Sequence, residues 1–331
     1  MFRNFLFLVA FCGAFASCST KQDLDVRESE RVIRLGAGGV EETPRTKAVV
    51  NSLTDLASPG VGDNIGICGV RVNSNTAAPV MGWGNVLPMD NVRTTAVSAA
   101  NGAVSWNGVY FYPLDNAYVK FCAYHPYASY EGNGRLRLEP SSTGKAPLLS
   151  FTLNGEDDIM YATPVIGKQG SAPDPLMFHH TLTQLTFEII DDSGTLVGEK
   201  IQSIEVLDVN TSSTMNIETG AFGTWGTKAN LTVSGTADVE ILSTAAQAVG
   251  SSIMLQPGQA SFKVRVNTSS LGSFTATIRP TSIGGNGSYE TSFAAGRSYL
   301  ISLRFDKTTE LGALATVTDW VLIGYDEITI K

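Results

Sequence analysis

The sequence predicts an all-β protein built from β-sandwiches. Short segments rich in β-branched and aromatic residues recur along most of the chain, and Gly and Asn-Gly pairs separate them. No stretch of a dozen residues has the period of an amphipathic helix. The 331 residues are 43% hydrophobic and only 16% charged, which is enough to bury a large core and argues against disorder. Strands in this number and at this spacing are typical of β-sandwiches.

The N-terminal segment is typical of an export signal. Arg3 precedes an apolar run at 5–16, and roughly twelve apolar residues are too few for a hydrocarbon core that needs about twenty. Small residues before Cys18 resemble the bacterial lipobox, in which Cys18 would receive lipid and become the new N-terminus. An ordinary signal peptide with an incidental cysteine is the alternative. We expect a signal peptide at 1–17 and a tether with a removable leader at 18–45.

The leader is predicted to hold the first strand. Residues 26–35 (VRESERVIRL) favour a strand in which Ile33 and Leu35 share a face. The glycine-rich stretch 36–39 predicts a break, and an acidic linker with a proline follows and reaches Arg45. An exposed arginine in such a segment is a natural protease site, although a simple lipoprotein linker would have a similar composition.

The rest of the chain is predicted to form two domains. A polar stretch rich in Pro and Gly at 167–175 separates an aromatic-rich half from a half rich in Thr, Ser and Val. We therefore expect one sandwich at 46–175 and a second at 176–331. The clearest strands are expected at 64–72, 118–127, 184–190, 201–209, 261–266, 274–280 and 298–305.

The cysteines allow two interpretations. Cys12 leaves with the signal and Cys18 carries lipid, so Cys68 and Cys122 remain. Export to an oxidising compartment permits a disulfide between them. Both lie in apolar strand-like runs, where buried free thiols are also common.

Charge and side-chain chemistry argue against several classes of function. A net charge of −8 and a pI near 5.0 argue against nucleic-acid binding. The neighbouring His179 and His180 would point to opposite sides of a strand, so they cannot readily bind one metal ion. The sequence contains no nucleophile elbow, P-loop, dinucleotide fingerprint or zinc-protease motif. We expect no enzymatic activity, no metal and no cofactor.

Aromatic residues are concentrated in the first half of the chain. They could form a carbohydrate-stacking platform, or they could form the core and rim of the first sandwich. The residues concerned are Trp106, Tyr110, Phe111, Tyr112, Tyr118, Phe121, Tyr124, Tyr127 and Tyr130.

Several segments, in order, resemble the fimbrillin family, the two-domain pilins of type V pili in Gram-negative bacteria. Besides the lipobox they are 62–67 (GDNIGI), 118–127 (YVKFCAYHPY), 158–162 (DIMYA), 178–182 (FHHTL), 295–299 (AGRSY) and 317–320 (VTDW). The resemblance implies a fold of two tandem transthyretin-like (Ig-like) β-sandwiches, in agreement with the strand pattern.

The resemblance also implies a mechanism of assembly. An Arg-specific protease would cut after Arg45 and remove the leader strand that contains Ile33 and Leu35. The vacated groove would then accept a strand from a neighbouring subunit. The candidate donor is the C-terminal segment 317–331. Its apolar residues on one face are Trp320, Leu322, Ile328 and Ile330.

The resemblance thus implies a pilus subunit that supports adhesion, first an outer-membrane lipoprotein precursor and then part of an extracellular fimbrium. Its partners would be other pilin subunits, the protease and, through lipid, the outer membrane. Two alternatives stay open: an accessory tip adhesin, and a monomeric surface lipoprotein that binds glycan or host protein. The removable leader and the spare terminal strand favour the pilin, because a simple binding lipoprotein needs neither.

Overall fold

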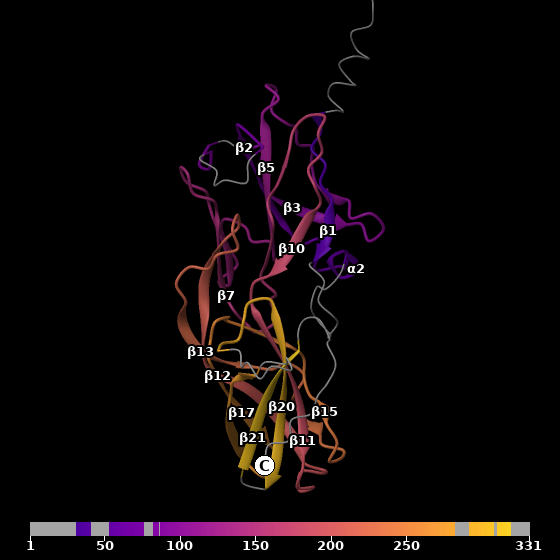
Figure 1. Cartoon of the computed structure of the whole chain (residues 1–331), viewed down its shortest axis with the longest axis vertical. Helices are drawn as coiled ribbons and strands as arrows, with labels where there is room; N and C mark the ends of the chain where they lie inside the picture. The colour runs from indigo at the N-terminus through magenta and orange to yellow at the C-terminus, as the bar shows by residue number, and fades with distance from the viewer. Residues whose placement is uncertain are drawn as a thin grey trace, which may run out of the picture.

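A computed structural model describes residues 31–40, 53–75, 82–85, 87–281, 291–307 and 310–318. The molecule is elongated, with the first strands of the chain at one end and the last strands at the other (Figure 1). Strands dominate it, and the predicted all-β sandwich architecture is confirmed. Within the described residues the only α-helix is α2 (Leu53–Leu56), a single turn.

Among the described residues the strands form three sheets. The first has the order β1 (Ala37–Val40), β10 (Leu176–His180), β8 (Met160–Ala162), β5 (Tyr118–His125), β2 (Gly66–Val72), β3 (Met89–Val97) and β4 (Val104–Trp106), with β9 (Val165–Gly167) paired to β5. The second has the order β15 (Gln247–Ala248), β11 (Thr183–Asp191), β20 (Arg297–Lys307), β21 (Glu310–Thr318) and β19 (Pro280–Thr281), with β16 (Ile253–Leu255) paired to β11.

The third sheet is organised around one long strand, β12 (Lys200–Asn216). Its order is β18 (Ser273–Ile278), β17 (Phe262–Thr268), β12, β7 (Leu148–Thr152) and β6 (Leu136–Glu139), and β13 (Gly226–Thr232) and β14 (Val239–Glu240) also pair with β12. Each of the seven strands expected from the sequence lies in one of these elements, namely β2, β5, β11, β12, β17, β18 and β20.

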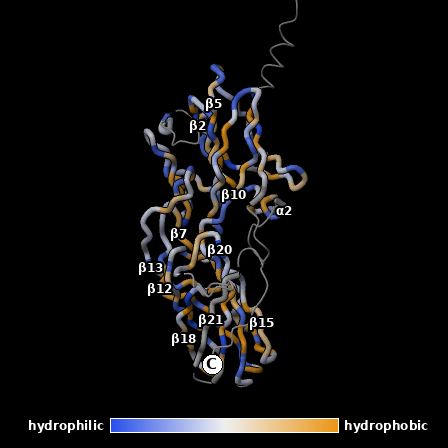
Figure 2. The backbone as a smooth tube through the Cα atoms, in the orientation of Figure 1, coloured by the Kyte–Doolittle hydropathy of each residue, from blue (hydrophilic) through white to orange (hydrophobic). Residues whose placement is uncertain are grey.

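The central strands of the first sheet are buried on both faces. In β2, Cys68 packs in the larger hydrophobic cluster, which continues into the other two sheets, whereas Ile67 packs in a second cluster with the leader. The neighbouring strand β5 divides in the same way, with Cys122 on the first side and Phe121 on the second. Elsewhere hydrophobic and hydrophilic residues alternate along many strands (Figure 2), as expected where one face meets solvent.

The predicted domain boundary at residue 175 does not separate the strands of one sheet from those of another. The hairpin β6–β7 precedes this position but joins the third sheet, because β7 pairs antiparallel with β12. Conversely, β10 follows it and pairs with β8 in the first sheet. The sheets therefore do not divide where the sequence changes in composition, and the boundary between 175 and 176 stays a prediction.

A buried ion pair links the first sheet to the third. Nζ of Lys120 in β5 lies 3.1 Å from Oε1 of Glu218, in the turn after β12, and their side chains are only 1% and 10% exposed. The indole Nε1 of Trp83 donates to the other carboxylate oxygen at 2.9 Å. Since a buried charge is costly without a partner, each of these residues depends on the other.

Replacing Lys120 by Met should lower the free energy of unfolding by about 3–5 kcal/mol, because Glu218 would stay buried without its countercharge. Denaturant unfolding, read from the midpoint at constant slope, measures the loss. The matched control is Lys228→Met, whose partner Asp208 is 68% exposed; it should lose less than about 1 kcal/mol. Equal losses in the two variants would contradict a structural role for the buried pair.

Candidate functional site

The leader segment, which we define as residues 31–40, lies between residues 102–112 and β10, and only its part Ala37–Val40 is a regular strand, β1. Along one edge, isolated antiparallel bridges join Val32 to Phe111 and Gly36 to Ala103, and the two bridges do not share one continuous register. Along its other edge β1 runs parallel to β10. The segment therefore fills a slot between two stretches of chain that are distant from it in sequence.

Main-chain hydrogen bonds hold the leader segment along both edges. Ile33 N donates to Tyr110 O at 2.8 Å, Val104 N donates to Leu35 O at 3.0 Å, and Ala37 N donates to Gly102 O at 2.7 Å. On the β10 side, Leu176 N donates to Gly36 O at 2.7 Å. These bonds need only a backbone in the extended conformation, so another strand could make them equally well.

Alternate side chains of the leader segment are buried in the second hydrophobic cluster. Ile33, Leu35 and Ala37 are 1%, 5% and 4% exposed, while the intervening Arg34 faces solvent. Their neighbours include Phe121 of β5 and Phe178 of β10. The slot thus takes two large apolar side chains and then a small one, at every second position.

The expected break at 36–39 is wrong, because the chain continues there as β1. Two glycines here lie close to a neighbouring stretch of chain. A Cβ on Gly38 would lie 2.4 Å from Sδ of Met177 in β10, and a Cβ on Gly102 would lie 2.0 Å from the carbonyl oxygen of Ala37. Gly102 also has a φ of +68°, which other residues rarely adopt. Residue 102 therefore has to be glycine, whereas Gly38 meets the flexible side chain of Met177 and Gly36 has room for a Cβ.

The remaining predicted site residues lie outside the described part of the chain. They are Cys18, Arg45, Trp320, Leu322, Ile328 and Ile330. Of the candidate donor segment 317–331, only the first two residues are described. Val317 and Thr318 close β21, where they pair with Tyr299 and Ser298 of β20.

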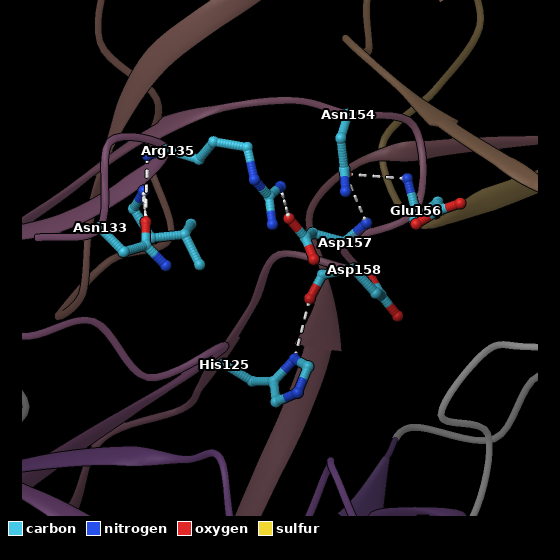
Figure 3. Close-up of polar contacts among 8 residues, drawn as sticks. His125, Asn133, Arg135, Asn154, Glu156, Asp157 and Asp158 are labelled. Atoms are coloured by element: carbon cyan, nitrogen blue, oxygen red, sulfur yellow. Dashed lines mark hydrogen bonds and ion pairs between the residues drawn. The ribbon is translucent and has the colours of Figure 1, made fainter. Parts of the chain in front are cut away.

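Two histidines and a carboxylate lie buried beside β10. Nδ1 of His180 lies 2.7 Å from Oδ2 of Asp158. Nδ1 of His125 donates to the main-chain oxygen of Asp158 at 3.0 Å. Figure 3 shows the His125 ring directed at Asp158, next to the ion pair between Arg135 and Asp157. These contacts secure β8 and β10, and β10 is the strand against which β1 packs.

Burial lowers the pKa of His125 below its ordinary value of 6.5, in spite of the nearby Asp158 and Asp157. Its Nδ1 carries the proton that the main-chain oxygen accepts, so Nε2 is unprotonated. Nε2 is buried and has no hydrogen-bond partner among the described residues. Protonation would therefore place a charge and an unpartnered N–H in the protein interior.

The sequence left open whether Cys68 and Cys122 form a disulfide, and in the structure both are free thiols. Cys68 and Cys122 face each other in the register of β2 and β5, and both are fully buried. Burial raises the pKa of Cys68 to about 12, and it also raises that of Cys122. Both side chains therefore stay protonated and pack as small apolar groups.

The aromatic residues of the first half divide between core and surface. Tyr112, Phe121 and Tyr124 are buried, with at most 4% exposure. Phe111 is 41% exposed and lies under the guanidinium of Arg31. The buried members support the core interpretation of this concentration over a single continuous platform.

Within the described ranges, no group of three or more His, Cys, Asp or Glu side chains is arranged to hold a metal ion. In the same ranges no helix has the length and hydropathy needed to cross a membrane.

Comparison with known proteins decides the family. The family model described as fimbrillin-like matches residues 47–320. The chain belongs to the fimbrillin-like family. The family resemblance found in the sequence is thereby confirmed, and this fimbrillin-like chain is a structural protein rather than an enzyme. Among curated proteins no match was found.

Solved structures share the fold of this fimbrillin-like chain. A fimbrial protein from Bacteroides vulgatus is 14% identical with a TM-score of 0.57, over 88% of this chain and 100% of its own. A Bacteroides ovatus protein named for cell adhesion is 16% identical with a TM-score of 0.58, over 89% and 99%. A Bacteroides uniformis protein with a similar name is 17% identical with a TM-score of 0.56, over 88% and 98%.

Shortening Leu35 to Ala should destabilise the leader segment by about 2–5 kcal/mol, because it leaves a cavity in the second hydrophobic cluster. Limited proteolysis should then cut within the leader segment at lower protease concentration, and denaturant unfolding should show the loss. The control Leu114→Ala removes the same atoms from a side chain that is 84% exposed and should change neither measurement. A leader segment that is equally protected in both variants would argue against its packing in the slot.

The fold should lose stability on acidification through His125. The pKa of His125 in the folded state lies below 6.5. The contribution of neutral His125 to the free energy of unfolding is therefore fully present above pH 6.5, and it is lost as the pH falls towards the folded-state pKa. In His125→Asn an amide can still donate to the Asp158 carbonyl but cannot titrate. We therefore compare pH 7.5 with pH 5.5, about one unit on either side of the ordinary histidine pKa. Between these two values the free energy of unfolding should fall less in His125→Asn than in the wild type. Parallel pH profiles would contradict the assignment.

Proposed function

We propose that this chain is the subunit of a fimbria that assembles by strand exchange at the slot now filled by the leader segment. The observation that carries the proposal is the position of residues 31–40. They contribute backbone and side chains to the first domain, yet they precede the predicted cleavage site at Arg45 and the start of the family match at residue 47. Cleavage at Arg45 would separate this strand from the domain that it completes.

The slot has the properties that strand exchange requires. Its two edges bind the leader segment through main-chain groups, which any extended segment offers. Its interior takes alternate apolar side chains, a pattern that recurs at Ile328 and Ile330 of the candidate donor. The proposed partner is therefore the C-terminal segment of another fimbrial subunit.

Proteolysis would determine whether the leader segment or the donor strand occupies the slot. While the chain is intact, the leader segment is tethered to its slot and has a high effective concentration there. Burial of Ile33 and Leu35 contributes at most about 3–6 kcal/mol. Four large apolar groups of a donor strand could contribute about 6–12 kcal/mol before the costs of association. Once the tether is cut, the longer donor should displace the leader.

The proposed route to the cell surface follows the sequence. Cys18 would carry the lipid that holds the precursor at the outer membrane, and an Arg-specific protease would act there after export. The product would be an extracellular fimbrium that supports adhesion. The names of the Bacteroides proteins with this fold are consistent with a fimbrial or adhesive role.

Treatment of the purified precursor with an Arg-specific protease should produce filaments, whereas Arg45→Ala should stay monomeric under the same conditions. Negative-stain electron microscopy and size-exclusion chromatography provide the readouts. The control Arg71→Ala removes an exposed arginine outside the leader and should assemble like the wild type. Truncation after Thr318 distinguishes leader cleavage from strand donation. The truncated chain should still be cleaved at Arg45, but it should form no filaments.

Normal filament formation by Arg45→Ala would refute cleavage at that position as the switch. Filament formation by the truncated chain would refute the C-terminal segment as the donor. A precursor that is cleaved, keeps its leader bound and binds glycan as a monomer would favour the surface-lipoprotein alternative.

A further inference from the structure

A cavity of about 410 Å³ lies where the leader segment meets the loop between β9 and β10. It is lined by Val32, Arg34, Tyr112, Lys168, Gly170, Ser171 and Ala172. Two of these residues are cationic, and none of the described lining residues is acidic. Among the described residues neither cation has an ion-pair partner. The cavity is therefore electropositive in a chain whose net charge is −8.

Tyr112, which lines the cavity, has a buried hydroxyl that lacks an acceptor among the residues described. Tyr112 is 4% exposed, and its Oη is buried without a hydrogen-bond partner in the described part of the chain. The hydroxyl lies at the base of the loop, since a Cβ on Gly167 would come within 2.6 Å of it. Burial raises the pKa of Tyr112 to about 12, so the hydroxyl keeps its proton at neutral pH. A buried donor of this kind is costly unless something accepts from it.

The walls of the cavity are fixed in position. Lys168 N donates to Ser171 O at 3.0 Å and Ser171 N donates to Lys168 O at 2.9 Å, which closes a tight turn. The ammonium of Lys168 lies 4.8 Å from the ring centre of Tyr118. The guanidinium of Arg31 donates to the carbonyl oxygen of Tyr112 at 3.1 Å, which ties the leader segment to a residue that lines the cavity.

We propose that this cavity binds an oxyanion of the phosphate class, either free or carried by a lipid headgroup, between Arg34, Lys168 and the hydroxyl of Tyr112. A guanidinium and an ammonium are the side chains that bind phosphate oxygens most strongly, and the tyrosine hydroxyl supplies a neutral donor to a further oxygen. The tetrahedral anion has enough oxygens to accept from all three groups at once.

The bound anion would connect the leader segment to the domain. Arg34 belongs to the leader segment, whereas Lys168 and Tyr112 belong to the part of the chain that follows Arg45. Occupancy should therefore oppose release of the leader, in addition to its main-chain hydrogen bonds. This consequence for assembly rests on the proposed function, whereas binding of the anion does not.

Isothermal titration of the purified precursor with inorganic phosphate at constant ionic strength tests the site. Lys168→Met should weaken binding about tenfold or more, because a charged donor is lost, and Tyr112→Phe should weaken it about threefold to tenfold. Removal of a costly unpartnered hydroxyl should leave the melting temperature without phosphate equal to or above that of the wild type, which shows that Tyr112→Phe is folded. The control Lys228→Met removes an exposed cation of the β12–β13 pair and should bind like the wild type.

Cosedimentation with vesicles distinguishes the two sources of the anion. A lipid headgroup is supported if phosphatidylglycerol vesicles capture the protein and phosphatidylcholine vesicles do not. This capture should be lost in Tyr112→Phe and should be competed by inorganic phosphate. Phosphate binding without vesicle capture supports the free anion. The proposal is overturned if millimolar phosphate does not bind, or if it binds equally to all three variants.

The same variants separate this inference from the proposed function. After cleavage, phosphate should slow release of the leader in the wild type and not in Lys168→Met. Site-dependent phosphate binding without filament growth would refute strand exchange and leave the anion site intact. Normal filament growth without phosphate binding would refute only the anion site.

Discussion

The first sheet and the neighbouring residues 102–112 depend on main-chain pairing with residues 31–40. Gly102 O, Val104 N, Tyr110 O and Leu176 N all take their partners from this segment. Buried main-chain groups that lose their partners cost free energy comparable to that of a lost hydrogen bond. These partners therefore need an extended segment in this position, but the pairing does not require that the segment belong to the same covalent chain.

The surroundings of the slot are held in place by contacts that do not involve the leader segment. Lys120 and Glu218 connect β5 to the turn after β12, and Asp158 connects β8 to β10 through His180. Since these buried polar groups have specific partners, they favour one arrangement of the strands. A change of strand in the slot would then leave most of the core undisturbed, and the affinity for a new strand would not be reduced by extensive refolding.

The sequence predicted the strands where local pattern decides them and missed features that depend on distant residues. Alternation placed Ile33 and Leu35 on one face, and both are buried, although the regular strand of this segment, β1, begins only at Ala37. The glycines at 36–39 indicated a break, whereas the chain continues there as β1, because residues of β10 pair with it. Likewise, the burial of Lys120 depends on Glu218, which lies far from it in the sequence. No local pattern contains these pairings.

The geometry of the slot restricts which strand could replace the leader segment. A replacement that keeps the present bonds must run parallel to β10 and antiparallel to residues 102–112. Its inward positions should match the present ones, where two large side chains and then a small one are buried. The main-chain hydrogen bonds alone would accept any extended segment of the right direction. The spacing and size of the buried side chains would discriminate among such segments, so specificity would come from these side chains.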